Sequence, residues 1–88
     1  MGCNWRLEFW VEDCSLEDKD KIDKHLTDEK LDFQDEGDYF DVVIYASYGF
    51  SVTAWVKEYH PMLQKMKGLR IYQYCLEQEA DEVFEVEE

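Results

Sequence analysis

The sequence has no long apolar run, little proline or glycine, and few basic residues. No stretch of about 18 consecutive apolar residues occurs, so we predict no membrane-spanning helix. One proline and four glycines leave long segments free to form regular helices and strands. Only 9 lysines and arginines stand against 22 aspartates and glutamates, which gives a net charge of -13. A surface with this much negative charge repels phosphates and anionic lipids. We therefore expect neither nucleic acid nor a membrane as a direct partner.

Cysteines are also few, and their number is odd. The chain has three, Cys3, Cys14 and Cys75, with no C-x-x-C pair. This usage favours reduced thiols and a cytoplasmic location. In an antiparallel sheet Cys75 would return to the end where Cys3 begins, while Cys3 and Cys14 would lie at opposite ends of one strand. We predict three reduced thiols, with Cys3 and Cys75 the nearest pair.

Catalytic motifs are absent. There is no glycine-rich phosphate loop, no nucleophile elbow and no Cys/His pattern with a recognisable local signature. The two histidines, His25 and His60, are not spaced with a cysteine or carboxylate as in zinc sites, so we expect ordinary surface histidines. We therefore predict a protein that is not an enzyme, with no catalytic residue, metal or cofactor.

The most apolar part of the chain is the segment 39–76. A run of β-branched and aromatic residues over 39–48 predicts a strand, and Gly49 ends it. Ser51 is a helix N-cap, and Gly68 occupies the position of a left-handed residue after the helix. Pro61 interrupts this helix, which either kinks or restarts there; because the apolar stripe stays in phase, we favour a kink. The stripe consists of Val52, Trp55, Val56, Tyr59, Leu63 and Met66.

The rest of the chain supplies three further elements. Residues 4–12 alternate between apolar and polar side chains, which predicts a half-buried strand. A helix over about 16–27 follows the N-cap Ser15, with only Leu16, Ile22 and Leu26 as an apolar stripe. Residues 31–48 are typical of a β-hairpin that turns at Gly37. The acidic tail 77–88 forms either an added edge strand through Phe84 and Val86 or a frayed end.

The order strand, helix, strand, strand, helix, strand over residues 4–76 resembles the ferredoxin-like βαββαβ domain. The resemblance implies one α+β domain over 1–88, with a four-stranded antiparallel sheet and two helices on one face. Trp55 and Tyr59 would then lie against the sheet. The covered face would carry Leu7, Phe9, Val42, Ile44 and Ile71, and the open face Arg6, Glu8, Trp10, Asp41, Val43, Tyr45, Tyr72 and Tyr74.

The open face is the first candidate binding surface. An aromatic sheet face is the platform on which RNA-recognition domains stack bases, but here carboxylates surround it and disfavour phosphate. A protein partner, a second copy of the chain or the folded-back tail fits better. The candidate anchors are Trp10, Tyr45, Tyr72 and Tyr74.

Acidic residues concentrate in two further candidate regions, the hairpin and the tail. The hairpin region contains one lysine and the tail no base. Rows of carboxylates on a rigid sheet imitate the charge pattern of nucleic-acid phosphates, and a basic channel would accept them. The candidate partner-binding residues are Asp32, Asp35, Glu36, Asp38 and Asp41 in the hairpin, and Glu77, Glu79, Asp81 and Glu82 in the tail.

In size, acidity and lack of catalytic motifs the chain resembles the small acidic DNA-mimic inhibitors of phages and mobile elements, of the anti-restriction and anti-CRISPR type. The resemblance implies a monomer or homodimer that binds a basic nucleic-acid-binding protein or nuclease complex in the host cytoplasm. Two alternatives stay open: an immunity protein or antitoxin that neutralises a nuclease toxin, and an interaction module that dimerises through the aromatic face.

Overall fold

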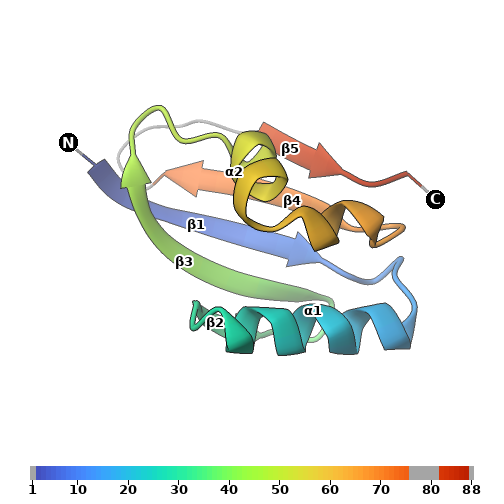
Figure 1. The fold of residues 1–88 in the computed structure, drawn as a ribbon. Helices are drawn as coiled ribbons and strands as arrows, with labels where there is room; N and C mark the ends of the chain where they lie inside the picture. The colour runs from blue at the N-terminus through green and yellow to red at the C-terminus, as the bar shows by residue number, and fades with distance from the viewer. Residues whose placement is uncertain (1, 76–81, 88) are drawn as a thin grey trace.

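A computed structural model describes residues 2–75 and 82–87 and shows an α+β fold (Figure 1). Within these residues two α-helices, one short 3₁₀ helix and five strands follow one another. No helix in this part of the chain is long and apolar enough to cross a membrane. In chain order the elements are β1 (Gly2–Trp10), α1 (Leu16–Asp28), β2 (Asp32–Asp35), β3 (Tyr39–Ser47), α2 (Val52–Tyr59), η1 (Pro61–Lys65), β4 (Arg70–Cys75) and β5 (Glu82–Glu85).

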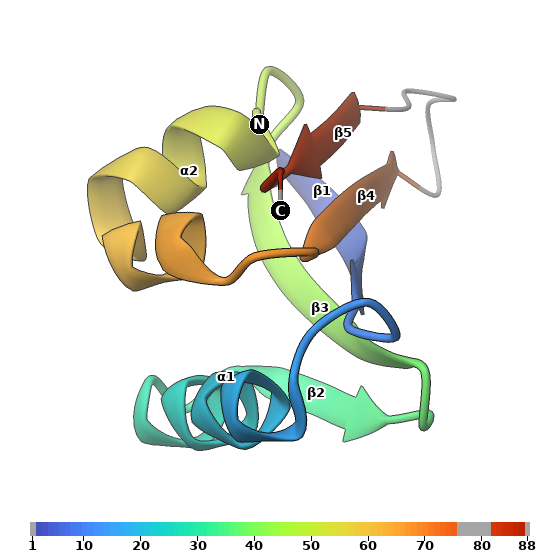
Figure 2. The ribbon, with the colours of Figure 1, turned by 90° about the vertical axis from the view of Figure 1, so that its right-hand side faces the viewer.

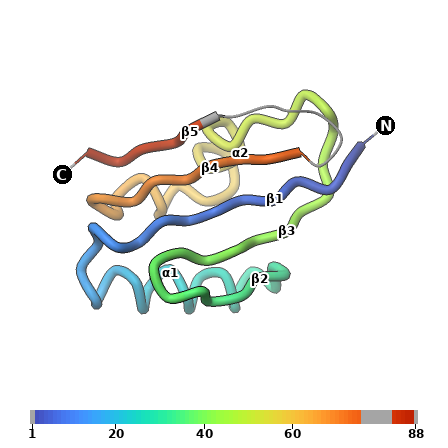
Figure 3. Tube along the Cα trace, turned by 180° about the vertical axis from the view of Figure 1, so that it is seen from behind, coloured from blue at the N-terminus to red at the C-terminus, as the bar shows by residue number. Residues whose placement is uncertain are grey.

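The strands form one antiparallel sheet in the order β2-β3-β1-β4-β5 (Figure 3). The central strand β1 pairs with β3 along its whole length and with β4 over Trp5–Trp10. The predicted hairpin is confirmed by β2 and β3. The sheet has five strands where four were expected, because β5 pairs with β4 at the edge. This confirms the edge-strand alternative for 82–85, whereas residues 77–81 lie outside the described residues.

Both helices cover the same face of the sheet (Figure 2). The alternation of β1 places Leu7 and Phe9 on that face, where both are fully buried. Trp55 is half-buried and lies against the sheet, its ring centroid 6.3 Å from that of Phe9. The predicted covered face is thus confirmed. The core of buried side chains consists of Leu7, Phe9, Val11, Ile22, Leu26, Phe40, Val42, Val52, Val56, Leu63, Met66, Leu69, Ile71 and Phe84.

Helix α1 begins as the sequence predicts but uses a narrower apolar face. The Ser15 hydroxyl accepts a hydrogen bond from the Asp18 backbone N–H at 3.1 Å, which is the N-cap interaction. Ile22 and Leu26 are fully buried, but Leu16 is 82% exposed, so its predicted place in the stripe is wrong. At 100° per residue Leu16 lies about 120° around the helix from Ile22, so both cannot face the core.

The predicted kinked helix over 51–67 is two separate elements. Helix α2 ends at Tyr59, His60 has non-helical backbone angles (φ -136°, ψ 53°), and Pro61 starts η1. The kink prediction is therefore wrong, and the restart at Pro61 is what occurs. The cause is that proline disfavours the α conformation in the residue before it. Tyr59, expected against the sheet, is 63% exposed, and that prediction is also wrong.

Gly68 connects η1 to β4 in the predicted left-handed conformation. Its φ is 88°, and a Cβ added there would lie 2.4 Å from the Asp13 carbonyl oxygen. Glycine is therefore required both by the backbone angle and by the close approach of the loop that precedes α1.

Cys3 and Cys75 form a second buried cluster with Trp5 at the other end of the sheet. The Sγ atoms of the two cysteines are 2.7 Å apart. The predicted proximity of this pair is confirmed, and the reduced state of the three cysteines stays a prediction.

Candidate functional site

The open face of the sheet, opposite the helices, is organised in rows across the strands. The strand register aligns residues of alternate position, and each row mixes aromatic and charged side chains. The predicted open-face residues of β1, β3 and β4 do share this face. The rows are Tyr39, Trp10, Arg70 and Glu85; then Asp41, Glu8, Tyr72 and Val83; then Asp32, Val43, Arg6 and Tyr74.

Arg6 binds two carboxylates in the middle of the open face. Its Nε donates to Asp41 Oδ1 at 2.9 Å, and its Nη2 donates to Glu8 Oε2. The hydrogen bond to Asp41 is the main cause that raises the pKa of Arg6 above its usual value, against a smaller effect of burial. Asp41, predicted as a partner-binding residue, is thus engaged within the protein and half-buried.

Arg70 forms the wall of a shallow hollow on the same face. Its Nη2 lies 2.9 Å from Glu12 Oε1 and 3.7 Å from Asp13 Oδ2. Its Nε is buried and has no hydrogen-bond partner among the described residues. The two arginines of the open face therefore each face two carboxylates, and each group (+1 with -2) keeps a net negative charge. The hollow has a volume of about 260 Å³ and is lined by Glu8, Trp10, Glu12, Arg70, Tyr72 and Tyr74.

The predicted aromatic anchors are spread over the face with different exposure. Trp10 stacks on Tyr39, with ring centroids 4.7 Å apart. The Arg6 guanidinium lies 5.8 Å from the centroid of the Tyr74 ring, a cation–π contact. Tyr45 is 73% exposed and is the most accessible of the predicted anchors. A partner would therefore meet a stacked, half-buried pair near one end of β3 and a projecting tyrosine near its other end.

The hairpin carboxylates lie at the edge of the sheet, around the β2–β3 turn. Asp35, Glu36 and Asp38 are all exposed there, as is Asp32 at the start of β2. Asp35 Oδ1 accepts from the Gly37 backbone N–H at 2.8 Å, and the Lys19 Nζ donates to the Gly37 carbonyl at 2.9 Å. These bonds hold the turn to α1, so its carboxylates are presented from a fixed loop.

The two acidic regions predicted from sequence lie at opposite edges of the sheet. The hairpin region includes the edge strand β2, and Glu82 begins the other edge strand, β5. Four interstrand spacings of about 4.8 Å separate β2 from β5 by about 19 Å. Glu77, Glu79 and Asp81 lie outside the described residues. Glu85 is exposed and aligns with Arg70 on the open face.

No protein-family model, no curated protein and no solved structure matches this chain. The open face is therefore interpreted from its own geometry. That geometry combines exposed and stacked aromatic rings, arginines bound to carboxylates and acidic edge strands, features suited to binding a surface of opposite charge.

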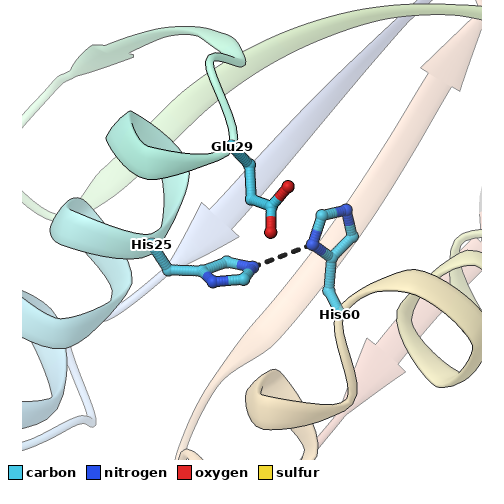
Figure 4. Close-up of side chains that lie close together, drawn as sticks. All are labelled: His25, Glu29 and His60. Atoms are coloured by element: carbon cyan, nitrogen blue, oxygen red, sulfur yellow. Dashed lines mark hydrogen bonds between the residues drawn. The ribbon is translucent and has the colours of Figure 1, made fainter.

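A second cluster of polar side chains lies on the helix side. His60 is buried at 6% exposure, and its ring meets that of the half-buried His25 (Figure 4). The expectation of two ordinary surface histidines is therefore wrong. The two residues are 35 positions apart, and no local motif joins them. The signals in the sequence were the spacing of His25 and Glu29, one helical turn apart, and the proline after His60.

Proposed function

We propose that this chain is a non-enzymatic, acidic binding protein that occupies the basic nucleic-acid-binding surface of a partner protein. The observation that supports the proposal is the open face, where aromatic side chains lie between two edge strands that each begin and end with a carboxylate residue. Nucleic acid presents the same combination, since its bases stack and its phosphates carry negative charge on both sides. A bound copy of this protein would thus compete with DNA or RNA.

The two kinds of side chain act at different stages of binding. Exposed carboxylates attract a basic surface over the screening length of about 8–10 Å and so raise the association rate. Aromatic side chains bury apolar area once the surfaces meet and so slow dissociation. Tyr45 and the hollow beside Trp10 and Tyr72 are the anchor points in this proposal.

The finer assignment of the fold belongs to the same proposal. The first four strands have the order β2-β3-β1-β4 and both helices cover one face, which supports a ferredoxin-like unit with β5 added at its edge. Such a unit leaves one sheet face open by construction, and many proteins use that face for binding.

The test compares two variants with equal changes of net charge. The first reverses the hairpin through Asp35→Lys, Glu36→Lys and Asp38→Lys, and the second reverses three exposed residues of the helix side through Glu17→Lys, Asp20→Lys and Glu58→Lys. Partners are captured from nuclease-treated cell extract at low and high salt, then purified and tested for displacement of a labelled DNA duplex. We expect the hairpin variant to associate at least about tenfold more slowly than the control variant, because turn positions control steering.

Three outcomes would contradict the proposal. The first is capture that is equally strong at low and high salt. The second is an equal loss of association rate in the two charge variants. The third is a captured protein that still binds the duplex in the presence of this chain. Selective capture of a single nuclease, with duplex displacement, would identify the immunity-protein form of the same interaction.

The exposed side chains of Tyr45 and Val43 favour a second candidate, dimerisation through the open face. Sedimentation of the purified chain distinguishes it, because the inhibitor needs no dimer. A dimer that Tyr45→Ala dissociates would support this candidate and would leave the face blocked to other partners.

A further inference from the structure

The cluster of His25, Glu29 and His60 joins α1 to the break between α2 and η1 (Figure 4). Each residue offers one ligand atom, and these atoms all lie within 4.8 Å of one another. His25 Nε2 and His60 Nδ1 are the closest pair, 2.8 Å apart. Two separate segments thus bring two imidazole nitrogens and one carboxylate oxygen close together.

Pro61 is the reason that His60 turns toward α1. The proline disfavours a helical conformation at His60, whose backbone leaves the helix at φ -136° and ψ 53°. The His60 N–H still donates to the Val56 carbonyl at 2.9 Å, and the His60 carbonyl accepts from the Leu63 N–H at 3.0 Å. The last bond of α2 and the first bond of η1 therefore fix this residue on both sides.

Helix geometry places the other two groups in adjacent turns. The Glu29 backbone N–H donates to the His25 carbonyl at 2.9 Å, so the two side chains stand one above the other. The Glu29 side chain is exposed, and among the described residues no hydrogen bond or ion pair occupies its carboxylate. Its torsions are therefore free to bring an oxygen to the two rings.

These ligands fit a transition-metal ion in number and kind. A zinc ion with bonds of about 2.0–2.1 Å has tetrahedral ligand atoms about 3.3 Å apart, so the two ring nitrogens need to separate by only about 0.5 Å. The ring N–H that now joins the histidines moves to the far nitrogen of the same ring, which frees both lone pairs. Two histidines and a glutamate leave a fourth position for water, as in zinc sites with three protein ligands.

The surroundings orient the His60 ring and allow an ion to enter. The Trp55 ring packs against that of His60, with centroids 4.3 Å apart, and fixes its orientation. A hollow of about 250 Å³ opens beside His25, lined by Lys21, Lys24, His25, Asp28 and Met62. Both lysines there are engaged, Lys21 by Glu17 and Lys24 by Asp28.

We propose that His25, Glu29 and His60 bind a divalent transition-metal ion, for which Zn²⁺ is the probe. The ion links α1 to the α2–η1 segment and carries a water in its fourth position. This site lies on the helix side of the sheet, so it is independent of the proposed function of the open face.

The experiment titrates the tag-free chain with Zn²⁺ by calorimetry and repeats the titration with Co²⁺, whose visible absorption reports the ligand set. We expect one ion per chain, a higher melting temperature with Zn²⁺, and shifts in the ring signals of both histidines in NMR spectra. Because the chain has only two histidines, each such signal belongs to this cluster. Loss of a group that only supports a ligand costs about 10–100-fold in metal affinity. Loss of a ligand itself should cost at least as much, so we expect His25→Ala and Glu29→Gln to bind Zn²⁺ at least about tenfold more weakly.

Two controls separate this site from other metal binding. Glu36→Gln removes an exposed carboxylate from the hairpin turn and should leave the affinity unchanged. Cys3→Ser with Cys75→Ser removes the buried thiol pair and should also leave it unchanged. If Zn²⁺ does not bind, if it binds equally to His25→Ala and Glu29→Gln, or if the cysteine variant loses it, the proposal is wrong. His25 is only partly buried and Glu29 is exposed, so both variants should stay folded. The test therefore does not require replacement of the buried His60.

Discussion

The two faces of this sheet share the same strands but are formed by different kinds of side-chain interaction. Along β1, the covered face has Leu7 and Phe9, which are fully buried against the helices. The open face of the same strand has Arg6, Glu8 and Trp10, which are half-buried and bonded to one another and to neighbouring strands. One face thus excludes water by apolar contact, and the other keeps its charges partly solvated.

The difference assigns stability mainly to the covered face, and the proposed function would assign recognition to the open face. Burying a large apolar side chain contributes about 1.5–3 kcal/mol, whereas an exposed ion pair contributes about 0–1 kcal/mol. Substitutions on the covered face should therefore unfold the protein, and substitutions on the open face should leave it folded and change what it binds. Three variants, from the largest expected effect to the smallest, test this division.

Phe9→Ala should have the largest effect. Phe9 is fully buried and its ring lies edge-on to Trp55. The cavity should cost about 3–5 kcal/mol, a large part of the about 4–13 kcal/mol expected for 88 residues. Denaturant unfolding followed by tryptophan fluorescence measures it, with Phe9→Leu as a milder variant. Tyr45→Ala on the open face should change the free energy of unfolding by less than about 0.5 kcal/mol. Equal losses of unfolding free energy in Phe9→Ala and Tyr45→Ala would contradict the division between the two faces.

Gln73→Met tests a polar side chain on the covered face. Gln73 is 2% exposed; its Oε1 accepts from the Val52 N–H at 2.7 Å and its Nε2 donates to the Phe50 carbonyl at 3.1 Å. Methionine keeps the volume but leaves both backbone groups unsatisfied at the start of α2, so we expect a loss of about 1–3 kcal/mol. Gln34→Met, at an exposed position of β2, is the matched control and should be near neutral. A stabilised Gln73→Met would show that the covered face tolerates any apolar residue.

Arg6→Met should have the smallest effect of the three. It removes the ion pairs to Glu8 and Asp41 and leaves these two carboxylates directly opposite each other. Because the group is partly solvated, we expect a loss of about 1 kcal/mol at low salt, and less at high salt. Lys21→Met, which removes an exposed helix ion pair, is the reference. A loss of more than about 2 kcal/mol in unfolding experiments would place the open face among the stabilising parts of the protein.

Local patterns were sufficient to predict most of the fold. Alternation in β1, the N-cap Ser15 and the left-handed Gly68 depend on neighbouring residues alone, and all three are as expected. The wrong predictions about the helices concern which residues face the core and where α2 ends. Leu16 lies off the buried face of α1, and the apparent continuity of the apolar stripe across Pro61 concealed the end of α2 at Tyr59.

Contacts between distant segments were harder to predict. The meeting of His25 with His60 depends on how α1 and α2 lie on the sheet, which no local pattern specifies. Likewise, the engagement of Asp41 by Arg6 follows from the register between β1 and β3. Element order alone left open whether the tail forms a strand, and the pairing of β5 with β4 resolves this for 82–85.

The edge strands also have a consequence for self-association. An edge strand presents unpaired backbone N–H and C=O groups, on which another chain can grow the sheet into an aggregate. Here both edges are only four residues long and have a carboxylate residue at each end, in Asp32–Asp35 and Glu82–Glu85. A second molecule that approached edge to edge would bring like charges together at each end of the new pairing. The acidity on which the proposed function rests would therefore also disfavour the addition of strands to the sheet, and this effect weakens as salt screens the carboxylates or acid neutralises them.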